Sequence, residues 1–405
     1  IAAGIAAVAI VGGSASWIDR NRIVRDIVDD YLAESGVAAN YDIISIAPHR
    51  QVIENLVVGN PARPDFTARR MVIETGVGWA GPELRRVSVE GARVYATYTG
   101  GRLSLGALDP LIFTDSKEPP ALPAIDLVLR DARALLLSNY GAVGMKLEGA
   151  GRLDDGFAGT LAASAPGAGI EDCRAEAATL YGKLTTKDGA SRLDGPLRLA
   201  GLDCGGAVLA RADIGTRLTL RRDFAGAEGD FALTGAGISY AALTGQTLSG
   251  TGRVTWSGEG LVAAHDLALA GIAAPQGKLA RLTSEGTWRG SSDAARGQWQ
   301  GNVRGTGLSA DAALGPALAA AQDSAQGTLL APLIAKARGG LAAALSGAAF
   351  EAEAIIRHKG EGVSLVIPAA QLASRRGERV LALSQVSAGI AGSGLTGLRG
   401  NVLAG

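Results

Sequence analysis

Apolar and polar residues alternate with a period of two in many short segments from about residue 66 to the end of the chain. In Thr247–Trp256, every even-numbered position is apolar or glycine and every odd-numbered position is polar. Successive side chains of a strand point to opposite faces, so this pattern predicts a strand with two unlike faces. Because the pattern recurs along most of the chain, it predicts a long sheet with one apolar side.

Turn signals separate the alternating segments and contain residues that tolerate positive φ. They are Asp154-Asp155-Gly156, Lys187-Asp188-Gly189, Ser257-Gly258-Glu259-Gly260 and Lys359-Gly360-Glu361-Gly362. Short turns of this kind join antiparallel neighbours. The predicted fold class is therefore mainly β, an elongated, twisted antiparallel β-groove. We picture it as an open, taco-like sheet with an apolar concave face, an N-terminal helix and a helical insert.

The composition favours one extended body over a set of conventional domains. Glycine accounts for 58 of the 405 residues, about twice the usual ~7%, while aromatic residues make up only 4%. Small residues on a strand leave space that a core of large side chains would fill. Basic and acidic residues balance at 39 each, and no basic stripe with interleaved aromatics occurs, so we expect no nucleic-acid partner.

We expect five segments along the chain. They are a trimmed membrane anchor helix (1–18), an amphipathic helix (19–36), β-groove repeats (37–327), a helical insert (328–346) and a continuing β-groove (347–405), truncated at the C-terminus because it lacks a polar terminal repeat.

The anchor prediction depends on the first residues. Ile1–Ser16 carries no charge and precedes Trp17, which suits a membrane interface, although the run is a few residues short of a spanning helix. A cleavable signal peptide is the alternative, because Ser14-Ala15-Ser16 offers a small-residue cleavage site. Both interpretations predict export. Arg20 and Arg22 follow this apolar segment. Positive charge normally marks the cytoplasmic side of a membrane helix, so these residues argue against a simple outward orientation.

Two cysteines, Cys173 and Cys204, follow acidic residues in similar contexts. They could lie on neighbouring turns of a repeating sheet and form a disulfide, which would indicate an oxidising compartment such as a periplasm. Two unpaired small residues are the alternative, because the sequence does not determine connectivity.

Common catalytic and nucleotide-binding motifs are absent from the sequence, including HExxH, CxxC, GxSxG and the phosphate-binding GxxxxGK[ST]. Gly392, Gly394 and Gly397 match GxGxxG but lack the strand-to-helix context that a dinucleotide site needs. His265 shares parity with Leu267 and so faces the apolar side; a ring satisfied by a backbone carbonyl is a simpler explanation than a ligand or proton-transfer role. We predict no enzyme, no catalytic residue, no metal site and no cofactor.

Three segments carry a resemblance to a known family: YLAESGVAANYDI (Tyr31–Ile43), VVGNPARPDFTARR (Val57–Arg70) and GRLSLGALDPL (Gly101–Leu111). They resemble the N-terminal part of the YdbH proteins, which are AsmA-like, anchored in the bacterial inner membrane and related in architecture to TamB; the copy here resembles those of alphaproteobacteria. The resemblance implies a periplasmic body and carriage of phospholipids between inner and outer membranes along an apolar β-groove. The implied partners are phospholipids, the inner membrane through the N-terminal helix, and outer-membrane or periplasmic proteins. An older family label is dicarboxylate transport, but nothing in this sequence shows a site for a small dianion.

We predict that the apolar residues of successive strands line the groove. They are Leu127, Leu129, Met145, Leu147, Leu197, Leu199, Leu218, Leu220, Val254, Trp256, Leu267, Leu269, Val363, Leu365 and Ile367. The structural alternative is that they form the dry core of a closed β-solenoid or sandwich. Two functional alternatives are an assembly factor for outer-membrane proteins that binds client strands at the groove edge, and an exported β-helical enzyme acting on polysaccharide.

Overall fold

A computed structural model describes residues 36–47, 49–78, 81–113, 120–170, 172–291, 295–311, 313–324, 326–327, 335, 345–360, 362–391 and 394–404. The predicted anchor (1–18), all but the last residue of the amphipathic helix (19–36), and most of the helical insert (328–346) lie outside these residues. Within them, no helix is long and apolar enough to cross a membrane.

The chain forms two compact units. The first comprises Ile1–Arg198 and Arg217–Ala225, and the second comprises Leu199–Thr216 and Gly226–Gly405. Two strands, β12 (Ala190–Cys204) and β13 (Ala207–Leu220), contribute residues to both. Each unit is built mainly of strands, as the alternation predicts.

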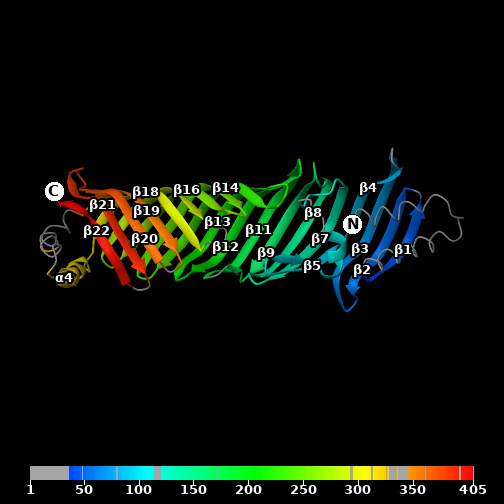
Figure 1. The fold of residues 1–405 in the computed structure, drawn as a ribbon, viewed down its shortest axis with the longest axis horizontal. Helices are drawn as coiled ribbons and strands as arrows, with labels where there is room; N and C mark the ends of the chain where they lie inside the picture. Colours follow the sequence, from blue (N-terminus) through cyan, green and yellow to red (C-terminus); the bar gives the residue numbers. More distant parts are fainter. Residues whose placement is uncertain are drawn as a thin grey trace. The chain divides into compact units, whose positions relative to one another are not determined.

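The other strands of the first unit follow in chain order, and most are labelled in Figure 1. They are β1 (Ala39–Ala47), β2 (Arg50–Asn60), β3 (Arg63–Gly78), β4 (Gly81–Glu90), β5 (Arg93–Thr99), β6 (Arg102–Ser104), β7 (Asp126–Ser138), β8 (Gly141–Arg152), β9 (Ala158–Pro166), β10 (Gly169–Ile170) and β11 (Cys173–Lys187).

The prediction of a wholly antiparallel sheet is wrong at β7. β4 and β5 follow one another along the same path, separated by Gly91 and Ala92, and both pair antiparallel with β3. β7 pairs with both of them in parallel, and the ladder is continuous because Gly91 donates to Arg130 and Arg133 donates to Ala92. A parallel neighbour needs a long return connection, which here runs from β6 to β7. The sequence pattern does not distinguish such a return from a further hairpin.

Two of the segments that carry the family resemblance meet in this unit. The carboxylate of Asp65, at the start of β3, accepts a hydrogen bond of 2.9 Å from the backbone N–H of Ala107. Ala107 lies in a 3₁₀ turn (Gly106–Leu108) that leads into the short helix α3 (Asp109–Ile112). Asp109 in turn accepts a 2.6 Å bond from the hydroxyl of Ser104. Gly106 has φ of +62° and lies against the Asp65 carboxylate, so a side chain would not fit there.

A small buried cluster lies in the first unit. It consists of Ala68, Val87, Val89, Ala92 and Ala132, and partly buried apolar side chains from β2, β3, β4 and β7 pack against it. The cluster therefore joins the β4–β5 path to the strands on its two sides.

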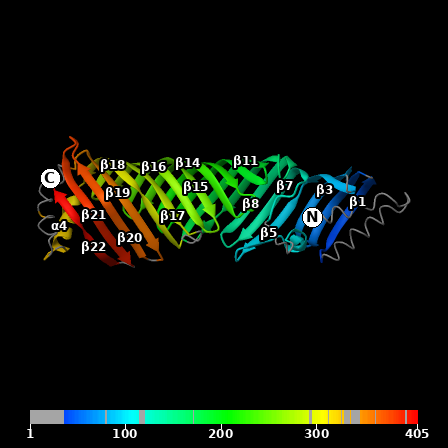
Figure 2. The same cartoon turned by 45° about the horizontal axis from the view of Figure 1, so that its top comes forward.

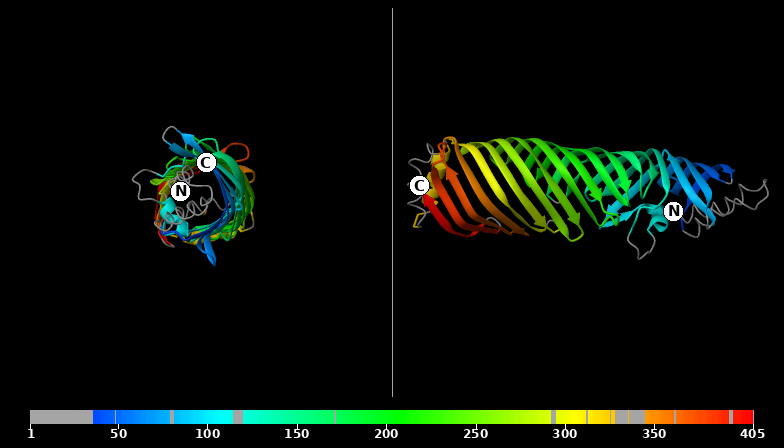
Figure 3. Two further views of the ribbon diagram at one scale, coloured as in Figure 1. Left: turned by 90° about the vertical axis from the view of Figure 1, so that its right-hand side faces the viewer. Right: turned by 90° about the horizontal axis from the view of Figure 1, so that it is seen from above.

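The second unit contains a succession of antiparallel strands, each paired with the next. They are β14 (Gly226–Tyr240), β15 (Leu243–Ser257), β16 (Gly260–Ala274), β17 (Gly277–Gly290), β18 (Arg296–Ala310), β19 (Ala348–Lys359), β20 (Gly362–Ala373), β21 (Arg379–Ala391) and β22 (Gly394–Ala404). Figure 2 and Figure 3 show these strands (green to red) side by side.

The predicted turns are confirmed. The described residues of 154–156, 187–189, 257–260 and 359–362 each fall where one strand ends and the next begins. At the second of them, Asp188 and Gly189 both adopt positive φ, as a two-residue hairpin turn of type I′ requires. Within the described residues, three helical elements were not predicted: the 3₁₀ turn (Gly106–Leu108), α3 and, the longest of them, the helix α4 (Leu314–Ser324). Its alanine-rich sequence lacks the strong apolar stripe by which a helix is usually identified.

A row of glycines shifts the alternation within the second unit. Three glycines with φ between +64° and +70° lie on β14, β16 and β18: Gly237, Gly271 and Gly307. On the strands between them, the opposite residues are Gln246 of β15 and Ala280 of β17. We call these five positions the glycine row. On β16 the less exposed positions are odd-numbered up to 269, but beyond Gly271 the buried residue is Ile272. Both strands of each pair shift together, so the register is kept and the apolar side chains remain on one face.

We expect Gly271→Ala to lower the free energy of unfolding by about 1–2 kcal/mol, because a left-handed backbone conformation disfavours any residue with a Cβ. Its Cβ would also stand 2.5 Å from the side chain of Gln246. Urea unfolding followed by circular dichroism measures the difference. Gly258→Ala is the control, because this turn glycine is outside the left-handed region and no atom lies within 4 Å of the place its Cβ would take. Equal stability of the two variants would contradict the role of the glycine row.

Candidate functional site

One face of the second unit is apolar across neighbouring strands. Directly paired residues share a face, so the register of the strand pairs defines it. We call the apolar face the set Phe231, Leu233, Leu248, Val254, Trp256, Leu261, Ala263, His265, Leu267, Leu269, Leu282, Ser284, Trp288, Trp299, Val303, Phe350, Ala352, Ala354, Ile356, His358, Val363 and Leu365, with the glycines between them. The alternate positions form the polar face.

Large side chains of the apolar face lie across glycines. The indole of Trp299 covers Gly301 on its own strand and Gly286 on β17, where a Cβ would stand 2.7 Å from the indole Nε1. Trp288 covers Gly290 and Gly297 in the same way. Rings that lie on bare backbone do not project far from the sheet. The high glycine content therefore lets a face rich in large side chains remain thin.

Exposure of the apolar face increases away from the glycine row. Ile272, beyond the row on β16, is 8% exposed. Towards the opposite ends of the strands, Trp256, Ile356 and Val363 are 38%, 37% and 37% exposed. Most of the positions between these extremes are half-buried. On β16 and β19 the face is thus shielded beyond the glycine row and more open to solvent at the other end, whereas on β14 Ala227, opposite Trp256, is 9% exposed.

His265 is an exception in the middle of this face. Its Nε2 lies 3.1 Å from the hydroxyl of Ser284 on β17, and its ring centroid lies 6.2 Å from that of Trp299. Burial lowers the pKa of His265, and the nearby carboxylate of Asp266 acts in the opposite direction. We expected a backbone carbonyl to satisfy the ring of His265. The observed partner is the side-chain hydroxyl of Ser284. A second imidazole, His358, stacks on Trp288 at 5.5 Å.

The first unit continues the predicted pattern with different packing. Met145 and Leu147 on β8 are half-buried and pair with Ala134 and Ala132 on β7. Leu127 and Leu129, in contrast, pack against the buried cluster. At these two positions the structure favours a packed interior over an accessible wall.

The fifteen residues predicted to line a groove share one property, since none of them is buried. Trp256 and Val363 are exposed, and the others are half-buried: Leu127, Leu129, Met145, Leu147, Leu197, Leu199, Leu218, Leu220, Val254, Leu267, Leu269, Leu365 and Ile367. Pairing brings Val254 and Trp256 beside residues 261–263 of β16, whereas Leu267 and Leu269 lie nearer the glycine row. Whether the fifteen contact a ligand stays a prediction.

The sequence analysis predicted β-structure between β16 and β20 but named no lining residue on β17, β18 or β19. Leu282, Trp288, Trp299, Phe350 and Ile356 continue the apolar face across β17, β18 and β19. Serine and glycine interrupt the alternation there, so short windows give a weak signal. The available signal was that, within each of these strands, the large apolar residues occupy alternate positions that include a tryptophan or a phenylalanine.

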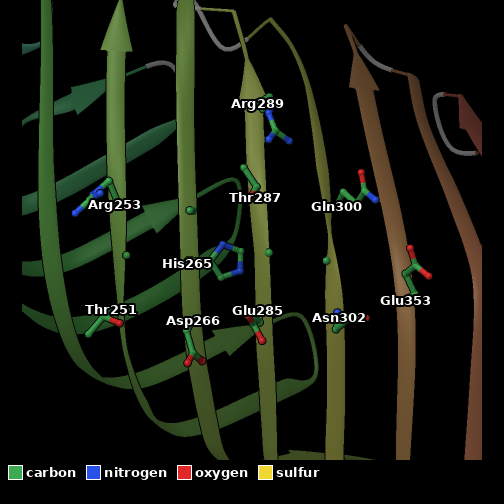
Figure 4. Close-up of a pocket in the computed structure, with 14 residues that line it drawn as sticks. Thr251, Arg253, His265, Asp266, Glu285, Thr287, Arg289, Gln300, Asn302 and Glu353 are labelled. Atoms are coloured by element: carbon green, nitrogen blue, oxygen red, sulfur yellow. The ribbon is translucent and has the colours of Figure 1, made fainter.

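The polar face carries cross-strand charges. Arg253 contacts Asp230 at 2.8 Å, and its pKa is raised by that hydrogen bond and charge. A shallow hollow of about 610 Å³ spans β15 to β19. Figure 4 shows Asp266, Glu285 and Asn302 at one level on successive strands. No group of three or more His, Cys, Asp or Glu within the described part of the chain could hold a metal ion.

A charge cluster occupies the polar side of the first unit. Arg93 and Arg133 contact the carboxylate of Asp131 at 2.9 and 3.2 Å, and Lys146 lies 4.0 Å away. The hydrogen bond from Arg93 lowers the pKa of Asp131. Asp131 has φ of +49° at a bulge in β7, and the bulge brings its carboxylate among cations that would otherwise repel one another.

Comparison with protein families gives a match over nearly the whole chain. The family described as YdbH-like, intermembrane phospholipid transport protein YdbH, matches residues 7–398. Neither the search of curated proteins nor the search of solved structures finds a match.

Neither Cys173 nor Cys204 is a free thiol in the described part of the chain. Their pairing with each other stays a prediction. Peptide mass mapping without reductant should yield one cross-linked peptide pair that reduction separates, and detection of two alkylated cysteines in the unreduced protein would contradict it.

We expect His265 to titrate below about 6.5, the ordinary pKa of histidine, because burial favours the neutral ring. The stability that the neutral ring of His265 contributes is then fully present at pH values above the unfolded-state pKa. It decreases as the pH falls through that pKa, because the unfolded chain then binds the proton more readily than the folded protein. A pH titration of histidine resonances by NMR measures this, with His265→Leu used to assign the signal. A midpoint at or above 6.5 would refute the effect of burial.

Proposed function

The chain belongs to the YdbH-like family of intermembrane phospholipid transport proteins, and from this premise we propose that its apolar face is the surface along which phospholipid tails move. The observation that carries the proposal is the incomplete burial of that face: its leucines and tryptophans are neither sealed inside the protein nor fully in water.

The energetic reason for such a surface is the cost of exposing acyl chains. A phospholipid that crosses water exposes about thirty methylene groups at ~0.8 kcal/mol each, a barrier on the order of 25 kcal/mol. Contact with a continuous apolar surface removes a large part of this cost at each position. A transport surface must also release what it binds, which favours many similar contacts over one deep pocket.

Strand pairing supports this arrangement. Leu248 lies opposite Leu269, and Leu269 lies opposite Leu282, so apolar contacts continue from strand to strand at the ~4.8 Å spacing of a sheet. The ring of Trp299 lies on Gly286 and Gly301, so it stays close to the sheet on the side where acyl chains would lie. A side chain at either glycine would displace the indole of Trp299.

The remaining parts of the proposal concern location. We place the body of the protein in the periplasm and its anchor in the inner membrane, on the strength of family membership and the uncharged segment Ile1–Ser16. The family is one of transport proteins, so no catalytic step is part of the proposal.

We expect Leu267→Asp to reduce the phospholipid that copurifies with the protein by about tenfold or more. The substitution removes apolar contact worth about 1.5–3 kcal/mol and places a carboxylate beside the tails. Extraction and mass spectrometry of bound lipid measure the loss, and circular dichroism confirms that the strands remain.

Ala264→Asp is the matched control. Ala264 lies on the same strand three residues away but faces the exposed, polar side. A photo-crosslinking residue at position 267 should capture phospholipid, and one at 264 should not. Equal capture at both positions, or undiminished lipid in Leu267→Asp, would refute the proposed surface.

A further inference from the structure

The apolar face contains polar ring nitrogens without hydrogen-bond partners at one place. His265 and Ser284 lie within hydrogen-bond distance of each other, and the indole Nε1 of Trp299 lies over the adjacent Gly286. Within the described residues, neither Nδ1 of His265 nor Nε1 of Trp299 has a hydrogen-bond partner. The apolar face contains no carboxylate among its named residues. The sequence neighbours Asp266 and Glu285 alternate to the polar face.

Aromatic rings that lie over glycines surround the imidazole on the apolar face. His265 lies opposite Gly252 on β15 and Gly286 on β17, and Gly301 continues this row on β18. Phe231 lies over the first of these glycines, and Trp299 lies over the other two. Two rings therefore flank the imidazole, and neither of its directly paired residues, Gly252 and Gly286, has a side chain.

The position of this cluster along the strands fits a molecule with an apolar and a polar end. Between His265 and the glycine row lie Leu267 and Leu269, at the shielded end of the face. On the other side of His265, the strands lead to the exposed end, where Trp256 is 38% exposed. If the acyl tails of a phospholipid point towards the glycine row, its headgroup points towards solvent. The phosphate, which links the two, then lies at the level of His265.

We propose that His265, Ser284 and Trp299 form a binding site for the anionic phosphate of a phospholipid whose tails lie towards the glycine row. The proposal rests on the proposed function and adds the site and the orientation of the lipid. An acceptor-only anion suits this site, because ring N–H and hydroxyl donors bond strongly to charged oxygen. An anion also stabilises the protonated imidazole, which burial alone disfavours.

The test compares two lipids with the same tails, dioleoyl phosphatidylglycerol and dioleoylglycerol, which lacks the phosphate. Native mass spectrometry of the full chain measures the affinity of each. We expect the wild-type protein to prefer phosphatidylglycerol by about tenfold. In His265→Leu/Ser284→Ala that preference should disappear, while dioleoylglycerol binding persists because the leucine contacts remain.

His358→Leu is the matched control. It removes the other imidazole of the apolar face, which stacks on Trp288 nearer the exposed end, and it should retain the preference. Absence of a preference in the wild-type protein, or an undiminished one in the double variant, overturns the phosphate site and leaves the apolar face intact as a proposal. Failure of both lipids to bind the wild-type protein overturns the proposed function with it. Displacement of phosphatidylglycerol by millimolar inorganic phosphate would assign the site to the free ion and overturn the lipid assignment.

Discussion

In-register antiparallel pairing is the constraint on which both faces of the second unit depend. When two strands pair without a shift, directly opposite residues point to the same face of the sheet, so an apolar side chain on one strand meets the apolar side of the next. The pairing of β14 with β15 and of β16 with β17 keeps one register through the glycine row. A slip of one residue would exchange the apolar and polar faces.

Glycine gives this sheet its particular surface. Under Trp288 and Trp299 it allows indole rings to lie on the backbone, and at Gly237, Gly271 and Gly307 it allows the strands to change the phase of their alternation without losing register. Both uses follow from the absence of a Cβ, either as space above the backbone or as access to positive φ. A large apolar surface therefore coexists with a low content of aromatic residues.

The same arrangement gives the apolar face a direction. Shielding at the glycine row and exposure at the opposite ends of β15, β16 and β19 create a gradient along these strands, with His265 between the two ends. A uniform apolar wall would bind a tail in any orientation. A graded wall with one group of donors distinguishes the two ends of an amphipathic molecule, which is a property suited to carrying lipids in a constant orientation.

The sequence by itself determined the mainly β class, the hairpin turns and the apolar parity of strands such as Thr247–Trp256, because these depend on local geometry with a period of two. It did not predict the parallel pairing of β7 with β4 and β5, since two strands separated by a long connection carry no local mark of their direction. It also missed the extension of the face through Trp288, Trp299 and Phe350. Tertiary structure alone decided that Leu127 and Leu129 pack on a buried cluster, and that His265, Ser284 and Trp299 meet. Such meetings depend on register between strands, which is set by many pairings at once and not by the residues that meet.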